Sequence, residues 1–302
     1  MPELIVYGLV LGSIIALGTI GFTLSTKIAD FCNYSHGDLM TVGAYIALLV
    51  SGTLLSGSGF LQGRIGPFSF GWGLLLSFLP AILVTAGLAI LIDRLVYRPL
   101  RRLGAPSIHF DMVSLGIAFA LRGVIYVIWG ADYHFYFSGV RPMIYLPWGI
   151  KLRTDEIFIM AVAWALVALT YVFLGRTKVG KALRATADNP DLARVAGIST
   201  ERMLTWCWGI VGALCAVSGI LYGIETQLRP EMGWIFLLPL FAALVLGSIG
   251  SITGALVGGL VLGIAQQVST AWMKPTYKPA VAFLVMILTL IFRPEGIFGR
   301  RR

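Results

Sequence analysis

The polar segment RTKVGKALRATADNPDLARVAGISTER, residues 176–202, lies between two long apolar runs. Residues 157–174 before it and 203–224 after it contain no charged side chain. Each run is long enough to cross the roughly 30 Å hydrocarbon core of a bilayer as a helix. The quoted stretch is therefore a polar loop between two membrane spans, and its clustered charge makes it the first place to look for a function.

The composition extends this interpretation to the whole chain. Of its 302 residues, 58% are hydrophobic and 12% are charged, whereas about a quarter of the residues of soluble domains are charged. No polar stretch is long enough to form a core of its own, so we expect one membrane domain over residues 1–302. The net charge of +9 could indicate a nucleic-acid binder. The basic residues, however, lie in short loops between apolar runs, where they act as topology signals, so we expect a lipid bilayer and no nucleic acid as partner.

Nine apolar segments are candidate membrane spans. They comprise residues 4–24, 39–55, 72–95, 112–129, 157–174, 203–224, 234–249, 255–272 and 281–292. Segments 39–55 and 234–249 are short for a bilayer, which favours half-helices buried within a bundle. Glycines spaced by four, as in Gly8/Gly12 and Gly259/Gly263, indicate helices that approach one another closely. The sequence predicts an all-α polytopic bundle of about eight or nine transmembrane segments, some of them short or discontinuous.

Three basic clusters predict the orientation of the chain. They are Arg94 to Arg102 after the third candidate span, the loop 176–202 after the fifth, and residues 293–302 at the end. By the positive-inside rule all three are cytoplasmic. We therefore expect a multi-pass protein of a cell's inner membrane, with the amino terminus outside and the carboxyl terminus in the cytoplasm.

The polar loop is expected to form two short amphipathic helices. The apolar face of the first consists of Val179, Ala182, Leu183 and Ala187. Asn189 is a good N-cap and Pro190 suits the first position of a second helix, while Gly197 followed by Ile198 is typical of a C-cap. Helices that lie on a membrane usually carry Trp, Phe or Leu, and this loop has few. Its alanine-rich faces therefore favour docking into a protein groove over lying on the lipid surface.

A second polar group interrupts the apolar sequence near the first span. It consists of Asn33, Ser35, His36, Gly37 and Asp38. Polar groups at membrane depth are costly and usually face a cavity, a partner or a helix break. Two interpretations remain open. The group lines a translocation path, or it is structural, with Asp38 or Ser35 capping a helix and His36 bonding to a backbone carbonyl.

The pairs His36-x-Asp38 and His109-x-Asp111 raise the possibility of a metal site or an intramembrane hydrolase. Residues two apart do not converge on one helix face, and the charge rule places His109 in a cytoplasmic loop. No further ligands cluster with them, so we predict neither a metal site nor an enzyme. The cysteines are expected to be packing thiols: Cys32, Cys207 and Cys215. A secondary transporter or channel remains the alternative of another class, although it would leave the two-helix loop unexplained.

Several segments together resemble one family. GKALRATADNPDLARVAGI, within the polar loop, resembles the coupling loop of ABC importer permeases of the branched-chain amino acid (LivH/LivM) type. Other segments similar to that family are NYSHGDLMTVGAY at 33–45, YRPLRR at 97–102, LVLGSIGSITGALVGGLVLG at 244–263 and RPEGIFG at 293–299. The similarity keeps the family's order over nearly the whole chain and is closer to the LivH type. The sequence departs at Tyr34, Ser35 and Asp38, where the family often has Phe, Ala and Glu.

This resemblance implies a permease subunit that pairs with a second homologous permease, two cytoplasmic ATPases and an extracytoplasmic solute-binding protein. The chain has no phosphate-binding G-x-x-x-x-G-K-[ST] loop, so ATP and Mg²⁺ would be bound by the ATPases and no cofactor by this chain. The residues implied to couple to the ATPases are Gly180, Ala182, Leu183, Arg184, Ala185, Asp188, Asn189, Leu192, Ala193, Gly197 and Ile198.

The implied solutes are branched-chain or other hydrophobic amino acids. Urea, short amides and other small polar solutes are the alternatives within the same family. The segment 131–156, with Tyr133, Tyr145 and Trp148, would contact the binding protein or, equally, form an aromatic membrane interface.

Overall fold

The computed structural model describes residues 1–54, 65–137, 141–145 and 151–299. Its helices are α1 (Pro2–Ala29), α2 (His36–Leu49), α4 (Trp72–Ile92), α5 (Arg98–Arg102), α6 (Ser107–Trp129), α7 (Thr154–Arg176), α8 (Lys178–Asp188), α9 (Pro190–Val195), α10 (Thr200–Glu225), α11 (Met232–Gly247), α12 (Ile252–Val268) and α13 (Lys278–Phe292). Two π-helical turns, Val50–Leu54 and Asp93–Tyr97, continue α2 and α4. Strands β1 (Met143–Tyr145) and β2 (Lys151–Arg153) form an antiparallel hairpin. Leu55, Trp148 and residues 300–302, which figure in the sequence predictions, lie outside the described residues.

The all-α polytopic architecture is confirmed. Among the described residues, seven helices are long and apolar enough to cross a membrane, and α11 is a shorter apolar helix. The segment predicted at 39–55 forms α2, which has only 14 residues before its π-helical turn. Each of the nine apolar segments therefore contains a helix, and the two that were expected to be short are short.

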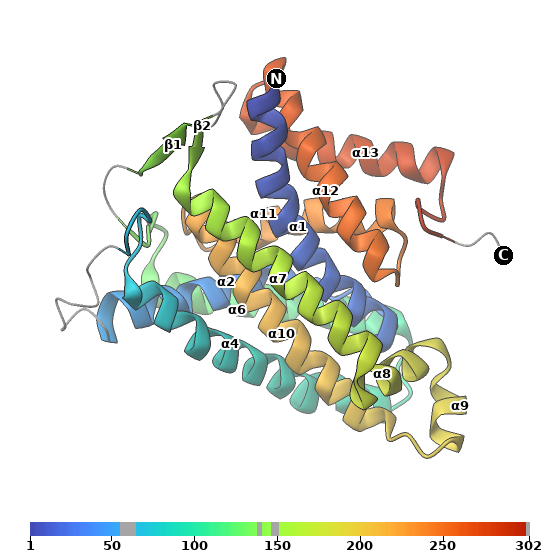
Figure 1. Ribbon diagram of the computed structural model, residues 1–302. Helices are drawn as coiled ribbons and strands as arrows, with labels where there is room; N and C mark the ends of the chain where they lie inside the picture. Colours follow the sequence, from blue (N-terminus) through green and yellow to red (C-terminus); the bar gives the residue numbers. More distant parts are fainter. Residues whose placement is uncertain (55–64, 138–140, 146–150, 300–302) are drawn as a thin grey trace.

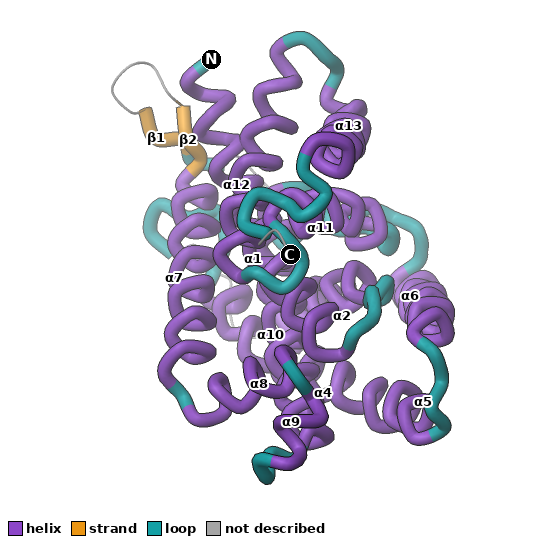
Figure 2. Tube along the Cα trace, turned by 90° about the vertical axis from the view of Figure 1, so that its right-hand side faces the viewer, coloured by secondary structure: helices purple, strands orange, loops and turns teal. Residues whose placement is uncertain are grey.

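The bundle has two distinct ends, which Figure 1 shows as the α8–α9 pair on one side and the β1–β2 hairpin on the other. At the α8–α9 end, Lys27 at the close of α1 forms an ion pair with Asp188 at 2.9 Å. At the hairpin end, the hydroxyl of Tyr7 donates to the carbonyl of Lys151 at 2.7 Å. The first helix thus runs from the hairpin end to the α8–α9 end, and Figure 2 shows the same separation from another side.

The core is built around α1 and α10, the two most buried spans. Small residues allow α1 to lie directly against α12, because a Cβ atom at Gly8 would be 2.7 Å from the Cα of Ile264 and one at Gly12 would be 2.9 Å from the Cα of Leu260. The close approach predicted from the glycine spacing is confirmed. The outer faces of α4, α6, α7 and α13 expose large apolar side chains, as helices next to lipid do.

One boundary differs from the prediction in a way that matters for the site. Helix α6 begins at Ser107, five residues before the predicted start at 112, so His109 belongs to its first turn and not to a loop. Pro106 is the N-cap in an extended conformation, with ψ of 156°. A proline disfavours the α conformation of the residue before it, so the helix does not extend back past Pro106. Hydropathy alone predicts a loop at residues 107–111, because the continuous apolar pattern begins only at Met112.

Candidate functional site

The polar group near the first span lies at the break between α1 and α2. Asp30 ends α1 in the left-handed region, with φ of 59°. The side-chain oxygen of Asn33 then accepts bonds from the amide and the hydroxyl of Ser35, at 3.2 and 2.7 Å, and from the hydroxyl of Tyr97 at 3.3 Å. Asn33 and Ser35 are buried. These hydrogen bonds therefore fix the connection between the two helices.

His36 and Gly37 also have partners within the chain. The Nε2 atom of His36 lies 3.0 Å from the carbonyl oxygen of Gly18 on α1, and its Nδ1 atom lies 3.4 Å from the sulfur of Cys215 on α10. Gly37 packs against Gly233 so closely that a Cβ atom at either position would collide with the other's carbonyl. The structural interpretation of His36, a bond to a backbone carbonyl, agrees with this geometry.

Asp38 differs from its neighbours because its partner reaches the edge of the bundle. Its carboxylate, with 0% exposure, accepts two bonds from Arg122 of α6, from Nε and from one terminal nitrogen, both at 3.0 Å. The Arg122 side chain keeps 13% exposure, and its guanidinium lies over the ring of Trp234 at 4.7 Å and the ring of Phe119 at 5.4 Å. A bidentate charge pair, whose guanidinium packs against two neighbouring aromatic rings, thus lies along one edge of α6 within the membrane span.

Polar groups continue along this edge of α6 in both directions. One helical turn toward the hairpin end, the hydroxyl of Tyr126 donates to Glu231 at 2.8 Å. Toward the α8–α9 end, the hydroxyl of Ser114 accepts from the amide of Tyr34, and Asp111 accepts from the amide of Cys32. We call the edge of α6 that carries Asp111, Ser114, Arg122 and Tyr126 the polar edge of α6. The apolar Phe119 lies on the same edge, next to Arg122. Burial, and then the carboxylate of Asp111, raise the pKa of the Cys32 thiol, so this thiol stays protonated and a weak nucleophile.

The second candidate region, the loop 176–202, folds as two short helices with defined ends. The hydroxyl of Thr177 caps α8 by accepting from the amide of Gly180 at 3.0 Å. The side chain of Asn189 caps α9 by accepting from the amides of Asp191 and Leu192. Gly197 closes α9 with φ of 82°. The two helices and the caps predicted for the second of them are confirmed, and Thr177 is a cap that the sequence analysis did not predict.

The apolar face of α8, however, does not point outward as we expected. Leu183 is 0% exposed and belongs to the cluster that includes Leu24 and Ile28 of α1 and Leu174 of α7. A Cβ atom at Gly180 would lie 2.5 Å from the Cα of Leu174, so α8 rests directly on the end of α7. An amphipathic pattern predicts that one face of a helix is covered but does not predict what covers it. Here α1 and α7 of the same chain cover the apolar face of α8.

The predicted coupling residues therefore divide into anchors and surface. Gly180, Leu183 and Ala193 are buried, and Ala182 and Ile198 are half-buried. The exposed members are Arg184, Ala185, Asp188, Asn189, Leu192 and Gly197. On α9, Leu192 is 66% exposed and the neighbouring Val195 is 86% exposed. These two are the large apolar side chains that the loop 176–202 exposes.

Comparison with known proteins matches this architecture to one family. The family model described as the permease component of branched-chain amino acid transport systems matches residues 4–290. The chain belongs to this family. The LivH permease protein of the high-affinity branched-chain amino acid transport system of Escherichia coli K12 is 31% identical over 305 residues, covering 97% of this chain and 94% of that protein. BraD of Pseudomonas aeruginosa is 30% identical over 318 residues, covering 99% and 98%. A probable LivH of Methanocaldococcus jannaschii is 29% identical over 306 residues, covering 96% and 90%.

This permease also has a cavity of about 950 Å³ at the hairpin end, between α1, α10, α11 and the start of α13. Arg153 lies at its wall and donates to Glu156 and Glu225, both at 2.6 Å. Leu11 and Phe236 contribute apolar surface to the same cavity. The cavity lies at the end of the bundle opposite α8 and α9.

The sequence interpretation missed several residues that the fold brings together. Of these residues, Arg122 could have been identified from the sequence, because a lone arginine in the apolar run 112–129 needs a partner inside the bundle. Arg153 and Glu225 are 72 residues apart, and no spacing signal connects them. Across the described parts of the chain, no three His, Cys, Asp or Glu side chains gather as a metal site would require.

Proposed function

We propose that this permease forms one half of the membrane path of an importer for branched-chain or other hydrophobic amino acids, and that a second, homologous permease forms the other half. The named relatives support this solute class, since each takes its name from branched-chain amino acid transport and aligns over at least 90% of its own length. ATP hydrolysis takes place in separate ATPase subunits, because the permease components of this family are not catalytic.

The observation that carries the two-permease path is the Asp38–Arg122 pair on the polar edge of α6. At membrane depth, a charged side chain that is partly exposed on the surface of its bundle is energetically costly if that surface faces lipid. The cost is removed if a second permease covers this edge and the space between them holds water. The rings of Phe119 and Trp234 then give the path an apolar surface next to a fixed charge pair, which suits a solute with an apolar side chain and charged main-chain groups.

The two ends of the bundle support a direction for the importer. The α8–α9 end carries the arginine clusters of residues 94–102 and 176–202, so we place it in the cytoplasm with the carboxyl terminus, and the amino terminus outside. Two ATPases, with ATP and Mg²⁺, would then dock on the exposed residues of α8 and α9. A solute-binding protein would dock at the hairpin end, over the 950 Å³ cavity.

Uptake by the complete transporter in proteoliposomes tests the solute class. We expect ATP-driven uptake of labelled leucine that an excess of isoleucine or valine abolishes and an excess of urea or acetamide does not. Uptake of urea with no uptake of leucine would instead show the small-amide branch of the family.

Cysteine accessibility tests the path separately. Phe119 lies on the polar edge of α6, whereas Val124 is exposed on another face of the same helix. In a variant free of native cysteines, Phe119→Cys should react with a charged, water-soluble thiol reagent and Val124→Cys should not. Reaction at Val124→Cys alone would place the water-filled surface on the opposite face of α6.

A further inference from the structure

A groove of about 720 Å³ lies on the outside of the bundle between α4 and α10, at their α8–α9 end. The two helices touch closely farther along, where a Cβ atom at Gly212 would lie 2.7 Å from the Cα of Ala86. At Gly209 the corresponding distance, to the Cδ1 atom of Ile90, is already an ordinary contact of 3.4 Å. The helices therefore diverge from this point, and the groove is the wedge between them.

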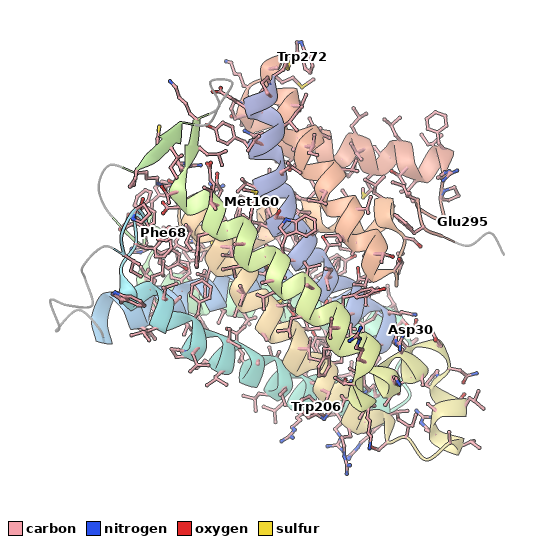
Figure 3. All side chains as sticks on the ribbon, in the orientation of Figure 1. Asp30, Phe68, Met160, Trp206, Trp272 and Glu295 are labelled. Carbon is pink, nitrogen blue, oxygen red and sulfur yellow. The ribbon has the colours of Figure 1, made fainter. Side chains whose placement is uncertain are left out.

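The wall of the groove is apolar at its narrow end and basic at its wide end. Ile90, Trp206, Ile210 and Ala213 line the part that belongs to the two membrane spans. Trp206 is exposed, as the indole of a membrane-interface tryptophan is. Figure 3 labels Trp206 at the lower margin of the molecule, near several nitrogen-tipped side chains.

The wide end is lined by Arg94, Arg98 and Arg202, with Glu201 among them. The π-helical turn at Asp93–Tyr97 lies between the spans of α4 and α5 and brings Arg94 and Arg98 to the same groove. Arg98 pairs with Glu201 at 3.1 Å. Within the described residues, Arg94 and Arg202 have no acidic partner, and both are exposed. The mouth of the groove thus holds more positive than negative charge, with two guanidinium groups available to an anion.

We propose that this groove binds an anionic phospholipid, with its phosphate between Arg94 and Arg202 and one acyl chain along Trp206 and Ile210. Only a molecule with an anionic head and a long apolar tail satisfies both ends of the wedge. Guanidinium groups bind phosphate oxygens in a bidentate manner, and basic pockets between transmembrane helices on the cytoplasmic side are a known type of site for acidic headgroups. The bound lipid would hold α4 and α10 at a fixed separation where the protein itself leaves a gap.

The test uses the complete transporter, purified in detergent and stripped of lipid. Dioleoyl phosphatidylglycerol, dioleoyl phosphatidylcholine and inorganic phosphate are added separately, and bound lipid and the midpoint of thermal unfolding are measured. We expect phosphatidylglycerol to remain bound and to raise the midpoint, and the other two additions to have little effect. An equal effect of inorganic phosphate would show a simple anion site and overturn the lipid assignment, as would an equal effect of phosphatidylcholine.

Matched variants locate the effect. Arg94→Gln with Arg202→Gln should weaken phosphatidylglycerol binding by about thirtyfold, from two lost charges near the membrane surface. Arg102→Gln with Arg176→Gln removes two exposed arginines from the same end without touching the groove, and should leave binding unchanged. Equal losses in both pairs would show only a general attraction of the basic end for acidic lipid.

A measurement on the unaltered protein covers the case in which these variants fold poorly. A phosphatidylglycerol analogue with a photoreactive acyl chain should crosslink within residues 205–213. Crosslinks confined to helices other than α4 and α10, or protection of this segment by the second permease in place of lipid, would overturn the proposal.

Discussion

Removal of Arg122 should destabilise this permease far more than removal of the arginines at its ends. Asp38 is fully buried and Arg122 supplies both of its side-chain hydrogen bonds. Arg122→Gln leaves this carboxylate without a counter-charge, which costs about 3–5 kcal/mol for a buried pair. It also removes the contact of the guanidinium with Trp234, worth about 0.5–2 kcal/mol. Asp38→Asn should cost less, about 1–3 kcal/mol, because Arg122 remains partly exposed and stacked on the indole.

The double variant, Asp38→Asn with Arg122→Gln, separates the pair from its surroundings. Two amides can hydrogen-bond to each other without charge, so we expect its stability to exceed the sum of the single losses by about 2 kcal/mol. The free energy of unfolding of the purified transporter measures this coupling, with Arg102→Gln as a control for loss of an exposed arginine. Strict additivity of the single effects would refute the inference that the two side chains stabilise the fold as a pair.

Transport by the same double variant tests the role of the pair in the path. If Asp38 and Arg122 line the passage, the neutral pair should leave the fold intact and still lower leucine uptake. If uptake matches that of the unaltered transporter at equal amounts of folded protein, the pair is structural and the path does not depend on its charge.

Three further predictions follow from burial and orientation. Leu192→Asp should abolish co-purification of the ATPases with little loss of chain stability, whereas Leu183→Ala should destabilise the chain by about 2–5 kcal/mol and leave ATPase binding to the folded fraction intact. Gly37→Ala should lower the yield of folded protein, because its methyl group would collide with the backbone of Gly233; an unchanged melting curve would show that α2 and α11 can separate at no cost. In intact cells of a strain expressing a cysteine-free variant, Met273→Cys should react with an impermeant thiol reagent and Ala185→Cys should not, and the reverse pattern would invert the orientation.

The fold was largely predictable because the bilayer restricts the choices. Backbone groups must be satisfied within a span, so each apolar run had to form a helix, and each contains one. The starts of helices were less predictable, as α6 shows. Its first two turns contain His109 and Asp111, which no hydropathy pattern includes, and only Pro106 marks where the helix begins.

The candidate site was only partly predictable, since its contacts join distant segments. The sequence selected the five residues around His36 but could not show that Asp38 alone among them has a partner, Arg122, that reaches the edge of the bundle. Its partner, Arg122, is 84 residues away. The coupling loop posed the opposite difficulty. Its periodicity correctly predicted a buried face containing Leu183. Periodicity does not show whether that face packs on a second protein or on α1 and α7 of the same chain.

The burial of Leu183 changes how movement at the loop would reach the membrane path. Because this face of α8 is packed on α1 and α7, a force applied to the exposed side of α8 or α9 moves those spans with it as a rigid unit. Helix α1 carries the Gly18 carbonyl that contacts His36, and His36 begins the helix that holds Asp38. A continuous series of packed contacts thus joins the loop to the Asp38–Arg122 pair. The exposed Lys27–Asp188 pair lies at the start of this series and contributes little to stability. We therefore expect this pair to separate at a lower cost than the buried contacts of Leu183.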